Sequence, residues 1–249
     1  MIDYANDKGL LMCGKCHTQK QYKTRYGIMP VMCDCERKAL EDEQAKQRKA
    51  EFKRRVKRLR RDGLTDDAYK TWSFEKDDRR NPSISDTCRK YVSEWQDMKA
   101  RNVGAIFYGS PGTGKTFYAC CIANALLEQR VPVLVTSFPR ILNKLQSAGF
   151  DDRNLTIDNI QCYDLVVFDD LGAERRTNYA VEQLFQVIDT RYRNNKPIII
   201  TTNLTPKEIR DTQDMALKRV YDRIEEMCVL PVKMVGPSRR PEIAKNKRP

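Results

Sequence analysis

The chain has 249 residues, of which 46 are Lys or Arg and 34 are Asp or Glu, so its net charge is +12. This length suits one substantial core plus a small accessory module, and the positive charge favours a polyanionic partner. The sequence has no apolar stretch near the ~20 residues of a membrane span and no signal peptide, and its nine cysteines argue against a disulfide framework, so we expect a cytoplasmic protein without a membrane partner.

Residues 1–36 are expected to form a zinc-binding module. They carry Cys13-x-x-Cys16 and, after sixteen intervening residues, Cys33-x-Cys35. Because so small a region cannot bury a core, four thiolates from two hairpin-like turns would surround Zn²⁺ as a structural ion. The second pair is unusually tight and His17 follows Cys16, so a Cys₃His site is an alternative, as are redox-active or free thiols. The other cysteines are expected to pack in the core: Cys88, Cys120, Cys121, Cys162 and Cys228.

Residues 37–63 are expected to form a basic helix that ends at Gly63. They hold twelve Lys or Arg against five Asp or Glu, with a narrow apolar stripe at helical spacing: Ala45, Phe52, Val56 and Leu59. Two interpretations stay open. The segment is either a solvated linker or a helix that docks on a partner protein or a nucleic-acid backbone.

Residues 64–240 have a globular pattern of alternating strands and helices. The first helix is expected to be capped by Ser85 or Asp86 and to run to the Gly104 region. Its apolar face comprises Cys88, Tyr91, Val92, Trp95 and Met98. Ahead of it, Trp72 and Phe74 suit either core packing or a place near an adenine ring.

The stretch from Gly109 to Thr116, GSPGTGKT, follows the apolar strand 105–108 and opens a helix that runs to Glu128. In such a turn the backbone N–H groups converge at a helix N-terminus, which binds phosphate. Lys115 can reach terminal phosphates, and the Thr116 hydroxyl can ligate Mg²⁺. We therefore expect a nucleoside triphosphate to contact Gly109, Ser110, Pro111, Gly112, Thr113, Gly114, Lys115, Thr116 and Phe117.

Two acidic residues follow the strand 165–168, which itself comes after the strand 131–136 and a helix ending at Gly149. Carboxylates at the end of a parallel strand lie where α/β sheets present ligands. We expect Asp169 to hold Mg²⁺ and Asp170 to orient and deprotonate an attacking water.

A further helix precedes the strand 197–200, which leads to Asn203. This Asn either contacts the γ-phosphate or the attacking water, or merely starts a turn. Because each strand is followed by a crossover helix, the pattern predicts a parallel sheet covered by helices on both faces.

The last expected helix carries Arg219 and Arg223 on one face, since they are four residues apart. Arg239 follows an apolar segment and a Gly-Pro turn. Residues 241–249 are a basic tail that we expect to be disordered.

In this order and spacing, GSPGTGKT, LVVFDDLGAE, PIIITTN and KRVYDRI resemble the AAA+ ATPases of the DnaC/DnaI replicative helicase loader group, whose close relative is the IstB transposition helper. The resemblance covers about residues 70–240. It extends less closely to the cysteine module, since some loaders carry a zinc-binding N-terminal domain that contacts the helicase.

The resemblance implies roles for individual residues. Residues 109–116 match the Walker A loop, Asp169 and Asp170 match Walker B, and Asn203 matches sensor 1. Arg223 falls at the arginine finger, which enters a neighbouring subunit's site, and Arg239 falls near the sensor 2 arginine. Many relatives have Glu where this chain has Asp170, so the base is shorter here or is assisted by Glu174, and slow hydrolysis would suit a timing switch.

The function that this resemblance implies is an ATP-dependent loader of a replicative hexameric helicase onto single-stranded DNA. Its copies would associate through shared ATP sites. Three alternatives remain: an IstB-like ATPase that assists a transposase, a P-loop small-molecule kinase, and a zinc adaptor with a vestigial ATPase.

Overall fold

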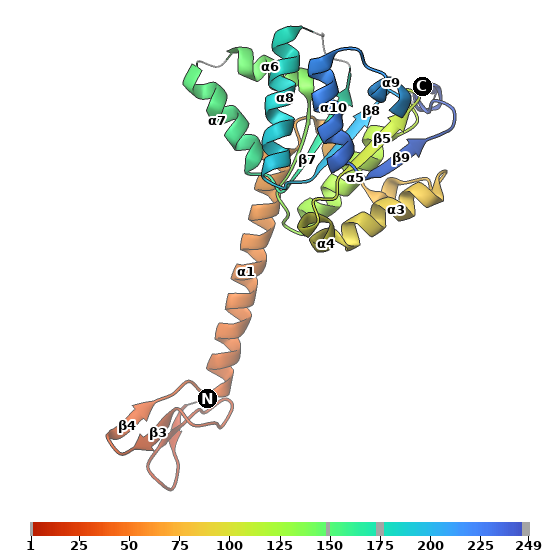
Figure 1. Cartoon of the computed structure of the whole chain (residues 1–249). Coiled ribbons are helices and arrows are strands. Elements are labelled where there is room, and N and C mark those ends of the chain that lie inside the picture. The colour runs from red at the N-terminus through yellow and green to blue at the C-terminus, as the bar shows by residue number, and fades with distance from the viewer. Residues whose placement is uncertain (1, 148–149, 173–176, 246–249) are drawn as a thin grey trace. The chain divides into compact units, whose positions relative to one another are not determined.

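The computed structural model of the chain describes residues 2–147, 150–172 and 177–245 (Figure 1). The chain divides into two compact units, Met1–Arg55 and Val56–Pro249. Within the described residues, no helix combines the length and apolar character that a membrane crossing needs.

The first unit consists of two small antiparallel hairpins and the first part of a long helix. Strand β1 (Tyr4–Ala5) pairs with β2 (Leu11–Met12), and β3 (Gln21–Thr24) pairs with β4 (Gly27–Pro30). Helix α1 spans Asp34–Gly63. The unit buries few side chains, among them Leu10, Cys13 and Cys33, so hydrophobic packing alone gives it little stability.

Two expectations for this region are corrected by the structure. The second cysteine pair lies at the start of α1 rather than in a hairpin-like turn, and the helix therefore begins before residue 37. Its first turn carries Asp34 and Glu36, which favour a helix N-terminus. At the other end, α1 stops at Gly63 as predicted, where a Cβ would collide with the carbonyl oxygen of Val133.

The second unit begins with short helices: α2 (Asp67–Thr71), the 3₁₀ turn η1 (Phe74–Lys76), α3 (Pro82–Ser93) and α4 (Trp95–Ala100). The expected cap at Ser85 or Asp86 is wrong. Helix α3 begins at Pro82, because proline suits the first helical position, and Ser85 lies buried inside the helix. The expected single helix is also interrupted at Glu94, although its apolar face continues from Tyr91 to Trp95.

A five-stranded sheet forms the centre of this unit. Its strands are β5 (Ala105–Gly109), β6 (Val133–Ser137), β7 (Leu165–Leu171), β8 (Ile198–Thr202) and β9 (Leu230–Met234). Their order is β6-β7-β8-β5-β9, and every neighbouring pair is parallel, which confirms the predicted parallel sheet. Because β5 lies between β8 and β9, the ends of these three strands meet at one edge.

Helices cover both faces of the sheet, as predicted (Figure 1). Along β7, Leu165 and Val167 pack with α3 and α5 (Lys115–Glu128), whereas Val166 and Phe168 pack on the opposite face. That opposite face is covered by α6 (Phe138–Ser147), α7 (Phe150–Gln161), α8 (Asn178–Arg193) and α10 (Met215–Met227). The short helices α9 (Pro206–Arg210) and α11 (Arg240–Lys245) complete the unit.

Three further differences from the sequence expectations concern α7, Cys162 and the tail. Helix α7 was not expected. Cys162, expected in the core, is exposed because it lies in the turn that follows α7. Residues 241–245, expected to be disordered, belong to helix α11. Gly149 lies outside the described residues.

Candidate nucleotide site and metal cluster

The loop between β5 and α5 has a backbone that only glycine adopts readily at three positions. Gly109, Gly112 and Gly114 have φ values of 135°, 81° and 102°. A Cβ on Gly112 would also collide with the side chain of Ser238, so the segment that follows β9 lies directly against the loop. The Thr113 hydroxyl donates to the Ser110 carbonyl at 2.9 Å and closes the turn.

Lys115 is the most enclosed cation at this edge of the sheet, with 5% of its surface exposed. Its Nζ donates to the carbonyl oxygens of Gly109 and Ser110, both at 2.9 Å, and to Oδ1 of Asn203 at 2.7 Å. Burial lowers the pKa of Lys115 below its ordinary value. The structure thus brings together two predicted site residues that follow different strands: Lys115 follows β5 and Asn203 follows β8.

The two acidic residues of β7 have different surroundings. The register between β7 and β8 shifts between Phe168 and Leu171, which lets Asp169 and Asp170 point in different directions. Asp169 is buried and accepts hydrogen bonds from the hydroxyls of Thr201 at 2.6 Å and Tyr69 at 3.0 Å.

Asp170 has a left-handed backbone, with φ of 56°, and its N–H donates to the Thr201 hydroxyl at 2.9 Å. Partial desolvation raises the pKa of its carboxyl group. A raised pKa favours a carboxylate that accepts a proton. Its side chain lines the cavity described next, whereas that of Asp169 does not.

A cavity of about 550 Å³ opens at this edge, a size that suits a nucleotide. Its lining includes these predicted residues: Pro111, Gly112, Gly114, Lys115, Thr116, Phe117, Asp170, Asn203 and Arg239. Trp72 lines it as well, whereas Phe74 is buried in the core under the Arg89 guanidinium. Of the two interpretations left open by the sequence, a place near the nucleotide therefore suits Trp72, and core packing holds for Phe74.

Arg239 provides a test of whether an anionic ligand fits. Its backbone N–H donates to the Gly112 carbonyl at 2.9 Å, and its Nη1 donates to Asp78 at 3.2 Å. Its Nη2 is buried and has no hydrogen-bond partner among the described residues. A buried guanidinium nitrogen normally has an acceptor, so an unpaired one beside a phosphate loop fits a phosphate group.

Arg223 is not brought into this cavity. Its Nε donates to Asp189 Oδ1 at 2.5 Å, and its guanidinium lies 4.8 Å from the Phe185 ring centre. One turn earlier on α10, Arg219 is exposed. Glu174, considered as an assisting base, lies outside the described residues.

Sequence reasoning missed several residues of the site. Tyr69 and Thr201 bind Asp169 by hydrogen bonds, and Arg80 pairs with Glu242 at 2.5 Å where both line the cavity. The remaining lining residues are Lys76, Asp78 and Arg240. Only Thr201 gave a usable signal, since it directly follows an apolar strand; the others come from segments without a motif.

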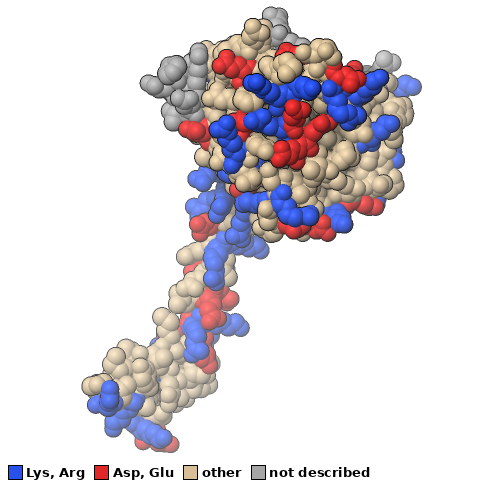
Figure 2. Space-filling model, in the orientation of Figure 1, with Lys and Arg blue, Asp and Glu red and all other residues tan. Residues whose placement is uncertain are grey.

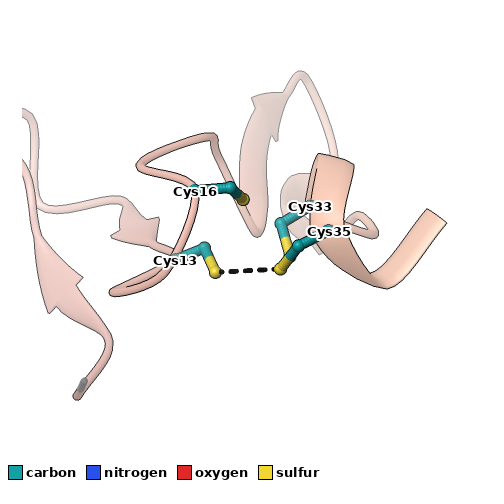
Figure 3. Close-up of side chains that lie close together, drawn as sticks. All are labelled: Cys13, Cys16, Cys33 and Cys35. Atoms are coloured by element: carbon teal, nitrogen blue, oxygen red, sulfur yellow. Dashed lines mark hydrogen bonds between the residues drawn. The ribbon is translucent and has the colours of Figure 1, made fainter. Parts of the chain in front are cut away.

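The four N-terminal cysteines form the second candidate site (Figure 3). Their sulfur atoms all lie within 4.8 Å of one another, with 3.5 Å between Cys13 and Cys35. Tetrahedral zinc with bonds of about 2.3 Å separates its sulfur ligands by about 3.8 Å, so the cluster fits such an ion. A hydrogen bond with the Thr18 hydroxyl lowers the pKa of Cys16 to about 5, which favours the metal-binding thiolate at that residue, whereas burial raises the pKa of Cys33.

His17, the alternative ligand, lies outside this cluster. Its Nδ1 is 3.2 Å from the Tyr4 hydroxyl, and the candidate metal ligands found within the described part of the chain are the four cysteines alone. All nine cysteines are free.

Comparison with known proteins gives a family match over most of the chain. The model of the family "IstB-like ATP binding protein" matches residues 37–245. Uncharacterized protein YqaM of Bacillus subtilis is 30% identical over 149 residues, which are 57% of this chain and 47% of that protein. The replicative helicase loader DnaC of Escherichia coli is 29% identical over 140 residues, which are 55% of this chain and 54% of that protein. The matched region thus spans about half the length of these relatives.

Among solved structures, the crystal structure of DnaI has a TM-score of 0.59 at 22% identity, and the match covers 71% of this chain and 95% of that one. At this level of identity the likeness concerns the fold.

Proposed function

The chain belongs to the IstB-like ATP binding proteins, and we propose that it is an ATP-dependent loader that delivers a replicative hexameric helicase onto single-stranded DNA. The family makes the P-loop unit an ATP-binding domain. The helicase is proposed as partner because the relatives include a protein named replicative helicase loader DnaC. Hydrolysis of ATP would be the step that releases the helicase.

The observation that carries the ATPase part of the proposal is the convergence of Lys115, Asn203, Asp170 and Arg239 on one cavity. Lys115 and Arg239 would bind the terminal phosphate, and Asn203 would hold Lys115 or the attacking water. Thr116 and Asp169 would hold Mg²⁺, which when bound neutralises phosphate charge. Asp170 would accept the proton of the attacking water on its carboxylate.

Self-association is part of the proposal, because Arg223, the expected arginine finger, does not line the cavity of its own protomer. Arg223 would exchange its contact with Asp189 for a phosphate in a neighbouring subunit's site. An arginine supplied in this way contributes a rate effect of about 10³–10⁵ in phosphoryl-transfer enzymes.

The experiment is a paired assay of phosphate release and of helicase loading onto a single-stranded circle. We expect the wild-type chain to hydrolyse ATP in the presence of DNA and to load the helicase, and Lys115→Ala to fail in both because it loses a phosphate contact. A wild-type chain that hydrolyses ATP but leaves the helicase off the circle would contradict the loader role while leaving the ATPase intact.

One second candidate has an observation in its favour. The family model carries the name of IstB, so an ATPase that assists a transposase is the main alternative. A pull-down from host extract, first with ATP and then with ADP, distinguishes the two: release of a helicase with ADP supports the loader, and release of a transposase supports the alternative.

A further inference from the structure

The positive charge of helix α1 is concentrated in one stretch. Residues 46–55 contain six cations and a single acidic residue, Glu51. The cations are Lys46, Arg48, Lys49, Lys53, Arg54 and Arg55. All six are exposed, and within the described residues none has a carboxylate partner. Figure 2 shows Lys and Arg side chains gathered along this helix.

The start of the same helix is different. Residues 34–45 contain five acidic residues and two cations, and Arg37 pairs with Asp34 at 2.9 Å. A helix that merely spaces two units is stabilised by such mixed charges, whereas like charges three or four residues apart destabilise it. Lys49 has this unfavourable spacing to both Lys46 and Lys53, so the stretch around it is suited to an external anion rather than to its own stability.

The hairpin of β3 and β4, in the same unit, adds exposed aromatic rings without any acidic residue. Residues 21–30, which form the hairpin, contain the cations Lys23 and Arg25 and no Asp or Glu. Tyr22 is 45% exposed and Tyr26 is 82% exposed, and the Arg25 guanidinium lies 4.7 Å from the Tyr26 ring centre. Exposed rings beside cations suit unpaired bases, because base–aromatic stacking needs bases that are not already stacked in a duplex.

We propose that the N-terminal unit is a binding surface for single-stranded DNA, in which Lys46, Lys49 and Lys53 bind the phosphate backbone and Tyr22 and Tyr26 stack on bases. The inference rests on the proposed function only for the choice of DNA as the strand. It assigns DNA contact to residues that lie outside the ATP cavity. An experiment can therefore contradict one of the two proposals while the other stands.

The test measures binding of the full chain to a labelled oligothymidylate by fluorescence anisotropy over a series of salt concentrations. The variant is K46Q/K49Q/K53Q. The matched control is K144Q/K207Q/K218Q, which removes the same charge from three exposed helical lysines of the ATPase unit. The slope of log K against log salt concentration is negative, and the loss of three phosphate contacts should reduce its magnitude by about 2 for a single strand. We expect affinity to fall at least tenfold.

We expect the control to bind like the wild type, and K46R/K49R/K53R to retain the affinity because it keeps the charge. Y22L/Y26L should weaken binding with an unchanged salt slope, since stacking releases no counterions. ATP binding, measured on each variant with a fluorescent analogue, should not change.

Equal affinities and slopes for the Lys→Gln variant and its control would overturn the proposal, as would tighter binding of a duplex of the same length. A Lys→Gln variant that binds DNA normally but no longer captures the helicase would assign the surface to a protein instead. Failure of ATP hydrolysis with DNA binding intact would contradict the proposed function and leave this surface standing.

Discussion

At the scale of single residues, the two hydrogen bonds to Asp169 distinguish this site from a bare Walker B carboxylate. Tyr69 and Thr201 occupy one oxygen each. The backbone around Tyr69 is held in turn, because the Asn124 amide donates to the Tyr69 carbonyl at 2.7 Å and to the Trp72 carbonyl at 2.9 Å. Tyr69 is therefore placed to orient a residue that we assign to Mg²⁺.

We expect Tyr69→Phe to raise the Mg²⁺ concentration needed for half-maximal ATP hydrolysis about tenfold, since removing a group that orients a metal ligand typically costs 10–100-fold in metal affinity. The KM for ATP should change less. Tyr163→Phe is the control, because the Tyr163 hydroxyl bonds the Asp62 carbonyl away from the cavity. An unchanged Mg²⁺ dependence would show that the Tyr69 hydroxyl is only structural.

Arg191 supports a second prediction at this scale. It is fully buried and has no carboxylate partner among the described residues, and its guanidinium donates to four carbonyl oxygens, those of Ile160, Tyr163, Asp164 and Pro197. Arg191→Met would leave these acceptors unpaired, so we expect a loss of ~3 kcal/mol or more in unfolding free energy. Urea denaturation measures it.

The control for this change is Arg193→Met, two residues away on the same helix. Arg193 is largely exposed and pairs with Asp189, so its loss should cost less than ~1 kcal/mol. Equal destabilisation by both changes would rule out the buried network as the cause.

The positions of residues were predictable where a motif lies at the end of a strand, and were not predictable where tertiary contacts place the side chain. The phosphate loop, Asp170 and Asn203 lie at or directly after the carboxyl ends of strands, so the parallel sheet alone brings them to one edge. Arg191 follows the pattern of an exposed helical cation, and its burial results from tertiary contacts with the segments that precede β7 and β8.

At the scale of elements, the same division applies. The strands β5 to β8 were predictable, because their short apolar runs have few other interpretations. Strand β9 was expected only as an apolar segment. Helix α7 was not, because its pattern has no clear apolar stripe; Ile157 and Ile160 become buried only when the helix packs against its neighbours. The start of α3 was missed because proline, a common helix breaker, is favourable at the first position.

The cysteine cluster joins two elements, the turn after β2 and the start of α1. If zinc holds them together, chelation should unfold the N-terminal unit, because its small core cannot replace the ion. We expect one zinc per chain by elemental analysis, and loss of both the metal and the hairpin amide signals in Cys16→Ser. The residues that line the ATP cavity all belong to the other unit, so ATP binding should persist.

His17→Ala is the control for this prediction, since His17 stands next to Cys16 but outside the cluster. It should retain the metal. Loss of zinc from His17→Ala with retention in Cys16→Ser would support the Cys₃His alternative, and a wild-type chain free of metal would contradict the structural role of zinc.

At the scale of the whole molecule, the question is whether one chain forms a complete site. The described cavity receives cations from its own protomer, Lys115, Arg239 and Arg240 among them, but not Arg223. Within the protomer, Arg223 shares Asp189 with Arg193, which binds the second carboxylate oxygen at 2.8 Å. Removing Arg223 therefore leaves Asp189 paired, and we expect Arg223→Ala to fold normally.

A complementation experiment tests the shared site without relying on loss of activity alone. Arg223→Ala should bind ATP but hydrolyse it at least 10³-fold more slowly, and Lys115→Ala should be inactive because its own phosphate loop is impaired. When the two variants are mixed, a Lys115→Ala subunit can supply its Arg223 to the intact loop of an Arg223→Ala neighbour. DNA-stimulated hydrolysis should then reappear at about a quarter of the wild-type rate if subunits mix at random, because that fraction of interfaces combines both intact parts. Arg219→Ala serves as the control for a nearby exposed arginine, and a mixture that stays inactive, or an Arg223→Ala variant that hydrolyses at the wild-type rate, would mean that each protomer works alone.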